Sequence, residues 1–214
     1  MCGIIGVIGS KEMPSKTLLE SLHHRGPDQH GYWQKKVHEK QVFLGHTRLS
    51  ILDLSELGKQ PMYAQNENVI LIFNGEIFNF QELRRGYINE QTFQSETDTE
   101  VILKLYEKFG SDFITLLRGD FAISILDTNK SSLHLYRDRG GVKPLYFYDQ
   151  NGIFAFGSEI KALFKAGIPN KLNKEQLSNY FVFKYSPGDH TLIEGVKRLD
   201  PGHQLHYDLL SGKC

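Results

Sequence analysis

The sequence predicts an α+β fold in which two β-sheets pack against each other and helices cover their outer sides. Three observations predict it. Strand-like segments dominate the chain, helical patterns interrupt them without a regular βαβ rhythm, and no low-complexity linker or internal repeat divides the 214 residues. The length allows one large domain or two small ones. We therefore expect two layered sheets rather than a doubly wound parallel sheet.

Strand patterns recur along most of the chain as short apolar runs or as alternation. In residues 121–125, Phe-Ala-Ile-Ser-Ile, the large side chains fall on one face and the small ones on the other. This period of two indicates a strand that packs closely on a second layer. The expected strands cover residues 4–8, 31–34, 41–46, 68–74, 120–127, 132–137, 145–148 and 153–156.

One helix has clear start and stop signals. Apolar residues at positions 102, 105, 106 and 109 follow the i, i+3, i+4, i+7 spacing of an amphipathic helix over residues 98–109. Thr97 and Glu100 have the spacing of a capping box, and Gly110 is a typical helix terminator. Further helices are expected over residues 14–23, 81–85, 158–165 and 174–181.

Composition excludes several classes of protein. Lys plus Arg equals Asp plus Glu at 25 each, and no basic stripe favours a nucleic acid or a membrane surface. No apolar run approaches the roughly 20 residues of a membrane span, and residues 4–8 are too short for a signal-peptide core. Cys2 and Cys214 lie at opposite ends, which is no disulfide framework and favours a reducing compartment. We expect a soluble, cytoplasmic protein, and the terminal Cys214 suggests a chain cut from something longer.

The start of the chain, Met1-Cys2-Gly3, is a candidate nucleophile. If Met1 is removed, Cys2 carries a thiol and a free α-amine with a pKa of about 7.7–8.0, which can accept the thiol proton. An accidental cysteine beside a buried strand is the simpler interpretation of this dipeptide alone. A dyad of Cys2 with a distant histidine such as His24 or His46 is another alternative, for which the sequence cannot show proximity.

Asn74 and Gly75 follow the apolar run 69–73 and could stabilise an oxyanion. Asn74 offers an amide donor, and Gly75 offers a backbone N–H without a side chain to block approach. The structural alternative is a turn, for which Asn-Gly is a favoured pair, and on this pair alone the turn is the better interpretation.

Arg48 and Asp98 add a pair of opposite charges. Arg48 follows another apolar strand, where a guanidinium suits bidentate capture of a carboxylate, although a surface salt bridge is the alternative. Asp98 sits in the first turn of the expected helix, which the helix dipole favours by itself, and its functional interpretation is a counter-charge for an ammonium group. Together they describe a pocket for an α-amino acid.

Other common sites are not indicated. The sequence contains no GxSxG, HExxH, CxxC or GxxxxGK[ST] pattern. His203 and His206 are three residues apart and point to opposite faces of a strand, without the companions of a metal site. We expect no metal and no cofactor in this chain.

With these residues the chain resembles a known family. It is similar to the glutaminase domain of class II, N-terminal-nucleophile glutamine amidotransferases, and most like that of glutamine-hydrolysing asparagine synthetases. The matching blocks span nearly the whole chain in order: MCGI at residues 1–4, HRGPD at 24–28, GHTRLSI at 45–51, QPM at 60–62, NGEI at 74–77, TDTEV at 97–101, RDR at 137–139, KPLY at 143–146, SEIKAL at 158–163 and PGH at 201–203.

The resemblance implies a four-layer αββα sandwich of two antiparallel sheets between helical layers, with residues 1–214 forming one glutaminase domain. It implies that Cys2 attacks the side-chain amide of L-glutamine to form a γ-glutamyl thioester, and that Asn74 and Gly75 form the oxyanion hole. Glutamate and ammonia would be the products. The remaining site residues would bind glutamine: Arg48 its carboxylate, Leu49, Ser50, Ile51 and Leu52 along that wall, and Glu76 and Asp98 its ammonium group.

Three departures concern the subtype. Thr47 stands where this branch usually has arginine or glutamate, Gly141 where it has leucine, and Phe78 where it has tyrosine. The default acceptor of the ammonia is aspartate, which would give asparagine. The alternative within the class is an asparagine-synthetase-like enzyme acting on a sugar acid or another carboxylate. An alternative of another class is a non-catalytic binding or scaffold domain with the same fold.

The synthetase domain of the family, with its SGGxDS-like ATP-binding loop, is absent from this chain. ATP and magnesium are expected on that domain, which would act in cis or in trans as the partner of this one. A homodimer remains open, and no nucleic acid or membrane partner is expected.

Overall fold

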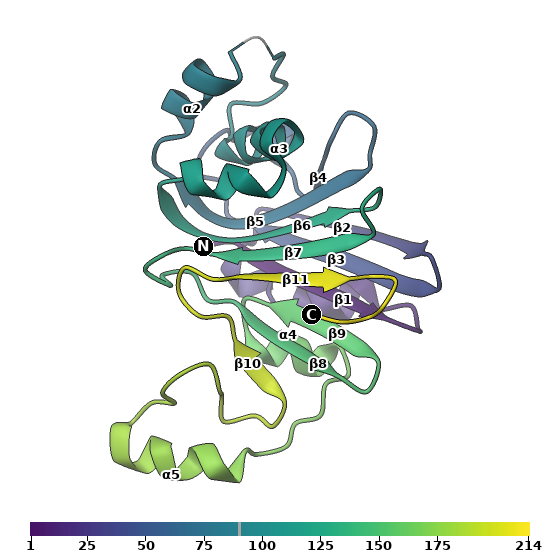
Figure 1. Ribbon diagram of the computed structural model, residues 1–214, viewed down its shortest axis with the longest axis vertical. Helices are drawn as coiled ribbons and strands as arrows, with labels where there is room; N and C mark the ends of the chain where they lie inside the picture. The colour runs from purple at the N-terminus through teal and green to yellow at the C-terminus, as the bar shows by residue number, and fades with distance from the viewer. Residues whose placement is uncertain (90) are drawn as a thin grey trace.

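The computed structural model describes residues 1–89 and 91–214 and contains two antiparallel sheets (Figure 1). The first sheet, in spatial order, consists of β10 (Val196–Arg198), β8 (Tyr146–Gln150), β9 (Ile153–Gly157), β1 (Gly3–Gly9), β3 (Lys40–Arg48) and β2 (Gln29–Val37). The second consists of β11 (Gln204–Asp208), β7 (Ser132–Arg137), β6 (Gly119–Asp127), β5 (Val69–Ile77) and β4 (Met62–Tyr63).

Helices cover the outer face of each sheet. The helices α1 (Ser15–Glu20) and α4 (Ile160–Lys165) contribute to an apolar cluster with the first sheet. The helices α2 (Phe80–Tyr87) and α3 (Asp98–Phe109) do the same with the second sheet. A third apolar cluster lies between the two sheets, so the layer order is αββα, as predicted. The helix α5 (Lys174–Phe183) projects from the body and buries none of its residues (Figure 1).

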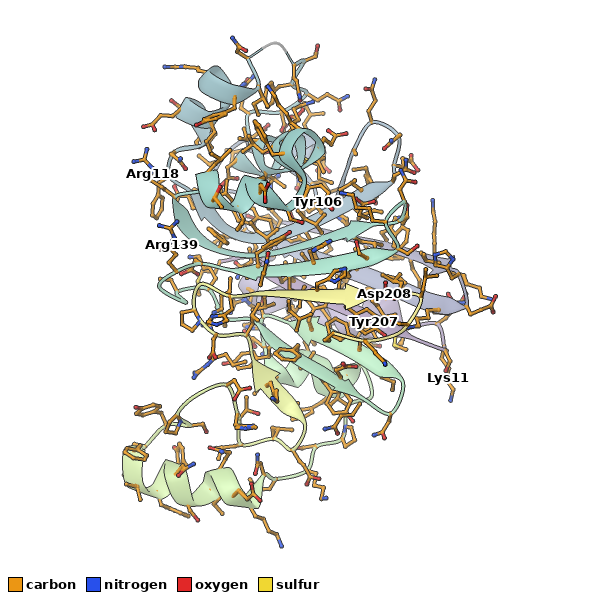
Figure 2. The ribbon with its side chains drawn as sticks, viewed as in Figure 1. Lys11, Tyr106, Arg118, Arg139, Tyr207 and Asp208 are labelled. Carbon is orange, nitrogen blue, oxygen red and sulfur yellow. The ribbon has the colours of Figure 1, made fainter. Side chains whose placement is uncertain are left out.

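The alternation in β6 explains how the two sheets approach each other. Phe121, Ile123 and Ile125 belong to the cluster under the helices, whereas Ala122 belongs to the cluster between the sheets. The predicted division into a large and a small face is therefore confirmed. At the edge of the sandwich, Tyr207 of β11 stacks on Phe154 of β9 with ring centroids 4.3 Å apart (Figure 2).

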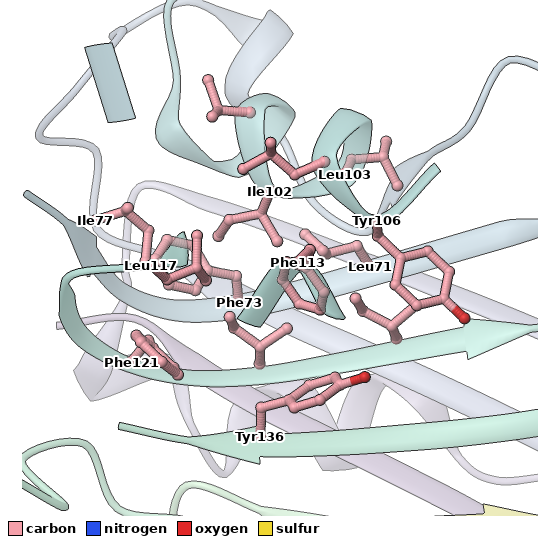
Figure 3. Packing of buried hydrophobic residues seen from close by; sticks show 14 of the residues in the cluster. Leu71, Phe73, Ile77, Ile102, Leu103, Tyr106, Phe113, Leu117, Phe121 and Tyr136 are labelled. Atoms are coloured by element: carbon pink, nitrogen blue, oxygen red, sulfur yellow. The ribbon is translucent and has the colours of Figure 1, made fainter. Parts of the chain in front are cut away.

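Three aromatic rings attach α3 to the second sheet. Phe113, from the 3₁₀ segment Gly110–Leu116, lies edge-on between Tyr106 of α3 and Tyr136 of β7 (Figure 3). The centroid distances are 5.8 and 5.3 Å, and edge-to-face pairs of this kind are favourable beyond their buried area. This packing fixes the helix that carries Asp98 relative to β5.

The start of α3 is held by a modified capping box. Thr97 Oγ1 accepts the N–H of Glu100 at 3.3 Å, as predicted. The Glu100 carboxylate does not return to Thr97; it accepts the backbone N–H groups of Gln94 and Ser95 at 2.7–3.1 Å. The second half of the predicted box is therefore wrong, because the carboxylate ties down the preceding loop instead. Gly110 ends the helix with a φ of +57°.

Every predicted strand and helix has a counterpart, and the differences concern short elements. The strands β4, β10 and β11 were not among the predicted ones, because two to five residues carry little periodicity and depend on their partner backbone. The first helix ends at Glu20, and a 3₁₀ turn over His23–Arg25 follows it. Among the described residues, no helix has the length and apolar character needed to cross a membrane.

Candidate active site

A cavity of about 120 Å³ lies where β1 begins, β3 ends and α3 begins, beside the last residues of β5. Nine of the ten predicted site residues line it; Ser50 does not. The lining residues are Met1, Cys2, Arg48, Leu49, Ile51, Leu52, Gln60, Phe73, Asn74, Gly75, Glu76, Thr97, Asp98, Thr99 and Lys143.

Cys2 presents its thiol to this cavity from the residue before β1. Its Sγ–H donates to the Leu49 carbonyl at 3.8 Å, and burial raises the pKa of the thiol above its ordinary value. The guanidinium of Arg25 holds the Cys2 backbone, since its Nε–H donates to the Cys2 carbonyl at 2.8 Å and its Nη1 binds Glu159 at 3.0 Å. A protonated thiol needs a base to remove its proton before the sulfur can act as a nucleophile. The nitrogen of Cys2 is an amide as long as Met1 is attached, so the α-amine becomes available only after Met1 is removed.

Neither histidine considered as a partner contacts this thiol. His24 Nε2 binds Glu159 Oε1 at 2.8 Å, and His46 Nε2 binds the carbonyl of Phe73 at 3.0 Å. Within residues 1–89 and 91–214, the one hydrogen bond of Cys2 Sγ goes to Leu49, and neither histidine lines the cavity. The cysteine–histidine dyad is therefore not formed.

Asn74 and Gly75 lie within β5 and not in a turn. They pair with Ala122 and Phe121 of β6, and the strand continues to Ile77. A Cβ on Gly75 would lie 2.2 Å from the carbonyl oxygen of Asp120, so the close approach of β6 requires glycine here. The turn interpretation is wrong because the pair belongs to a strand with a neighbour on one side.

The polar groups of this pair are turned toward the cavity. The side-chain oxygen and nitrogen of Asn74 have no hydrogen-bond partner among the described residues, although Asn74 is only 1% exposed. The N–H groups of Phe73 and Ile77 both donate away from β6, to Gln60 and Asp98. Because strand residues alternate, the N–H of Gly75 between them points to the same free edge. A buried, unpartnered carboxamide next to an N–H on a free strand edge of the same cavity suits an atom that develops negative charge.

Arg48 ends β3 with its guanidinium already engaged. Its Nη1 donates to Gln29 Oε1 at 2.7 Å and to the carbonyl of Ser55 at 3.1 Å. Its Nη2 donates to the carbonyls of Leu52 and Asp53 at 2.9 and 2.5 Å. These four bonds use all four Nη hydrogens and leave Nε–H, so bidentate capture of a carboxylate is not available in this arrangement. Arg48 thus holds the loop over residues 52–55, which begins with Leu52 on the wall of the cavity that Leu49 and Ile51 also line.

The same wall is held from the HRGPD block. Asp28 Oδ2 accepts the N–H of Ser50 at 2.7 Å, which fixes the loop outside the cavity at that point. Ile51, in contrast, lines the cavity while 71% of it is exposed. Ser50 thus contributes through its backbone to the loop, and its side chain is not part of the lining.

Asp98 is a buried carboxylate that lines the same cavity as the Cys2 thiol. Its Oδ2 accepts the N–H of Ile77 at 3.0 Å. Burial raises its pKa to about 6, and the nearby charge of Glu76 acts in the same direction. Two adjacent carboxylates with one raised pKa suit a cationic group of a ligand, which would relieve their repulsion.

Six lining residues were not predicted as site residues: Met1, Gln60, Phe73, Thr97, Thr99 and Lys143. Gln60 and Lys143 open the QPM and KPLY blocks, so a signal existed, but nothing in the sequence assigned them a role. In the part of the chain that the structure describes, no group of three or more His, Cys, Asp or Glu residues is placed to hold a metal ion. His206 stacks on His134 with ring centroids 4.8 Å apart.

Comparison with known proteins decides the family. The family model of the glutamine amidotransferase domain matches residues 1–211. The chain belongs to the class II glutamine amidotransferase family. This domain is 36% identical to a putative glutamine-hydrolysing asparagine synthetase 2 of Methanocaldococcus jannaschii, over 98% of the chain and 44% of that protein. It is 37% identical to asparagine synthetase 1 of Bacillus subtilis, over 96% of the chain and 33% of that protein.

Two further similarities bear on function and fold. The amidotransferase domain is 34% identical to the amidase chry2 of Gibberella zeae, over 89% of the chain and 28% of that protein. A solved structure described as the allosteric regulatory enzyme of purine biosynthesis superposes with a TM-score of 0.71 at 21% identity, over 97% of the chain and 47% of that structure. The second likeness shows the fold alone. The chain spans less than half the length of these curated relatives.

Proposed function

We propose that this chain hydrolyses the side-chain amide of L-glutamine to glutamate and ammonia. One observation carries the proposal: a thiol at residue 2, an unpartnered buried carboxamide at Asn74 and a carboxylate at Asp98 line one small cavity. Family membership supports glutamine as the substrate. The cavity offers a nucleophile, donors for an oxyanion and a counter-charge for an ammonium group.

The proposed reaction begins once Met1 is removed. The α-amine of Cys2 accepts the thiol proton while Sγ attacks the amide carbon of glutamine. Asn74 Nδ2 and the Gly75 N–H stabilise the negative oxygen of the tetrahedral intermediate. The amine returns its proton to the leaving nitrogen, ammonia departs, and water cleaves the γ-glutamyl thioester to give glutamate. Asp98 and Glu76 hold the ammonium group of glutamine. The wall of the cavity next to Arg48 faces the α-carboxylate of glutamine.

The proposed fate of the ammonia is amidation of a carboxylate by an ATP-dependent synthetase portion, in cis or in trans. Aspartate as the acceptor, giving asparagine, is supported by the relatives called asparagine synthetases at 36–37% identity. Another carboxylate acceptor is the second candidate, supported by the relative called an amidase at 34% identity. ATP and magnesium would belong to the synthetase portion.

The proposal is tested by measuring intact mass and glutamate release on the same expressed preparation. We expect a mass that lacks Met1 and stoichiometric formation of glutamate and ammonia from glutamine. A processed chain that releases no glutamate, alone or with a synthetase partner added, would indicate a non-catalytic binding domain with this fold.

The pH dependence of kcat/KM should report the titration of two groups, the α-amine of Cys2 and the carboxylate of Asp98. The α-amine must be unprotonated, so log(kcat/KM) rises with a slope of about one up to pH 8. The pKa of Asp98 is raised to about 6, so below that pH a proton neutralises the carboxylate that binds the ammonium group. The slope should therefore increase to about two below pH 6. Initial rates of glutamate release between pH 5 and pH 9 measure this profile.

The matched variant is Asp98→Asn, which should raise KM and retain a slope of about one throughout this range. A wild-type profile with a single slope down to pH 5 would contradict the assignment of Asp98 to the ammonium group.

A further inference from the structure

The backbone of Phe73 is held by two buried side chains instead of by a strand. Its N–H donates to Gln60 Oε1 at 2.6 Å, and its carbonyl accepts the Nε2–H of His46 at 3.0 Å. Gln60 is 4% exposed and His46 is 0% exposed, so both bonds are shielded from water. These bonds fix the peptide planes on either side of Phe73.

The topology explains why side chains are needed there. The strand β4 pairs with β5 only at Tyr63–Ile70 and Met62–Leu71, and the chain before Met62 leaves the sheet. The edge of β5 beyond Leu71 is therefore buried without a neighbouring strand. Buried backbone groups must be paired, and Gln60 supplies an acceptor in the plane where β4 would have continued. His46 reaches this edge from β3 of the opposite sheet.

The peptide plane held by His46 is the one that leads into Asn74. The carbonyl of Phe73 and the N–H of Asn74 share this plane. The carboxamide of Asn74 has no partner of its own among the described residues, so its direction depends on the backbone that carries it. Gln60 also donates through Nε2 to Thr99 Oγ1 at 3.2 Å, one residue after Asp98. It thus connects the amide end of the cavity to the proposed ammonium end.

We propose that His46 and Gln60 are positioning residues that aim the Asn74 carboxamide and the Gly75 N–H at the reacting carbonyl of glutamine. This inference rests on the proposed glutaminase function and extends it to two residues that the sequence did not connect with the oxyanion site. Neither residue needs to touch the reacting atoms. Their contribution is greatest in the transition state, when the oxyanion forms, because a small misplacement of preorganised donors reduces the rate.

The protonation state of the His46 ring suits a permanent hydrogen-bond donor. Complete burial lowers its pKa to about 3, so the ring is neutral at the pH values of the assay. A carbonyl can only accept, so the ring proton is on Nε2. The Nδ1 atom is buried and unpartnered among the described residues, which is consistent with a ring selected for its Nε2 bond.

The test uses three variants. Gln60→Met and His46→Leu each remove one of the two bonds and keep a similar side-chain volume. His46→Gln can restore a hydrogen-bond donor at position 46. We expect kcat to fall roughly 10- to 100-fold in the first two, with KM changed less than about twofold, and to recover partly in His46→Gln. The second readout is inhibition by the aldehyde analogue of glutamate, whose hemithioacetal with Cys2 mimics the tetrahedral intermediate. Its Ki should rise by the same factor as kcat falls, whereas inhibition by the product glutamate should barely change.

The controls are Gln65→Met and His190→Leu, the same replacements at exposed positions outside the cavity, which should behave as wild type. Thermal unfolding identifies a variant that fails to fold, and Gln60→Met tests the other peptide of Phe73 if His46→Leu is lost. Lower stability with unchanged kcat, or a rise in KM alone, would overturn the positioning role in an active wild-type enzyme. A correctly processed wild type that neither releases glutamate nor binds the aldehyde would overturn the proposed function, and this inference with it.

Discussion

Replacing Cys2 with alanine should abolish glutamate release, with a loss in kcat on the order of 10⁴-fold or more. The variant removes the only group in the cavity that the mechanism uses as nucleophile, and the buried site offers water no equivalent activation. Because the one hydrogen bond of the thiol among the described residues is long, 3.8 Å to the Leu49 carbonyl, the fold should persist. The measurement is glutamate formation from glutamine, with circular dichroism and thermal unfolding as evidence of a folded protein.

Cys214 supplies the matched control. It is the other cysteine of the chain, exposed at the opposite end, so Cys214→Ala should leave glutamate release unchanged. Mass spectrometry after rapid quenching should detect a γ-glutamyl adduct on wild type and on Cys214→Ala, but not on Cys2→Ala. Unchanged glutamate release by Cys2→Ala would exclude the N-terminal-nucleophile mechanism for this chain.

Replacing Asn74 with alanine should lower kcat by about 10²–10³, the usual effect of removing one oxyanion donor. The carboxamide of Asn74 has no hydrogen-bond partner among the described residues, so the substitution breaks no visible side-chain bond of the folded state. We therefore expect thermal stability at or above that of wild type, since a buried unsatisfied carboxamide is costly. A loss of activity with retained or increased stability is the signature of a group kept for function.

The split between kcat and KM distinguishes this role from substrate binding. An interaction made only with the oxyanion lowers kcat and leaves KM nearly unchanged. The same substitution at the exposed Asn170 should have no effect on either constant. A rise in KM at constant kcat would instead place Asn74 against the ground-state substrate.

Much of the fold was predictable because its sheets obey simple alternation. The strand β7 and the helix α3 agree residue for residue with the predicted ranges 132–137 and 98–109. Both have boundaries set by local chemistry, such as the Thr97 cap. The short strands β4 and β10 have no such local signal, since each forms only because a longer strand offers it a partner. The hydrogen-bond partners of the Glu100 carboxylate likewise depend on the loop before the helix, which the capping-box pattern does not describe.

The site shows the same difference between what the local sequence predicts and what the folded structure decides. Motif blocks named Cys2, Asn74 and Asp98, and the folded chain places all three around one cavity. They did not reveal that the Nη groups of Arg48 are consumed by Gln29 and by the loop that follows Arg48, or that Gly75 is required by the backbone of β6. Both facts depend on the path of the folded backbone, which the motif blocks do not describe.

The sequence by itself determined the layered sandwich, the family and the candidate reactive groups. Each of these depends on residue type and on short-range order, which periodicity and motif blocks record directly. Only the tertiary structure decided which polar groups remain free. Hydrogen bonds between distant segments pair His24 with Glu159 and Arg48 with Gln29, and they hold Phe73 between His46 and Gln60. The Asn74 carboxamide is among the buried groups left unpaired in the described residues, and its burial without a partner costs free energy that a bound oxyanion would recover.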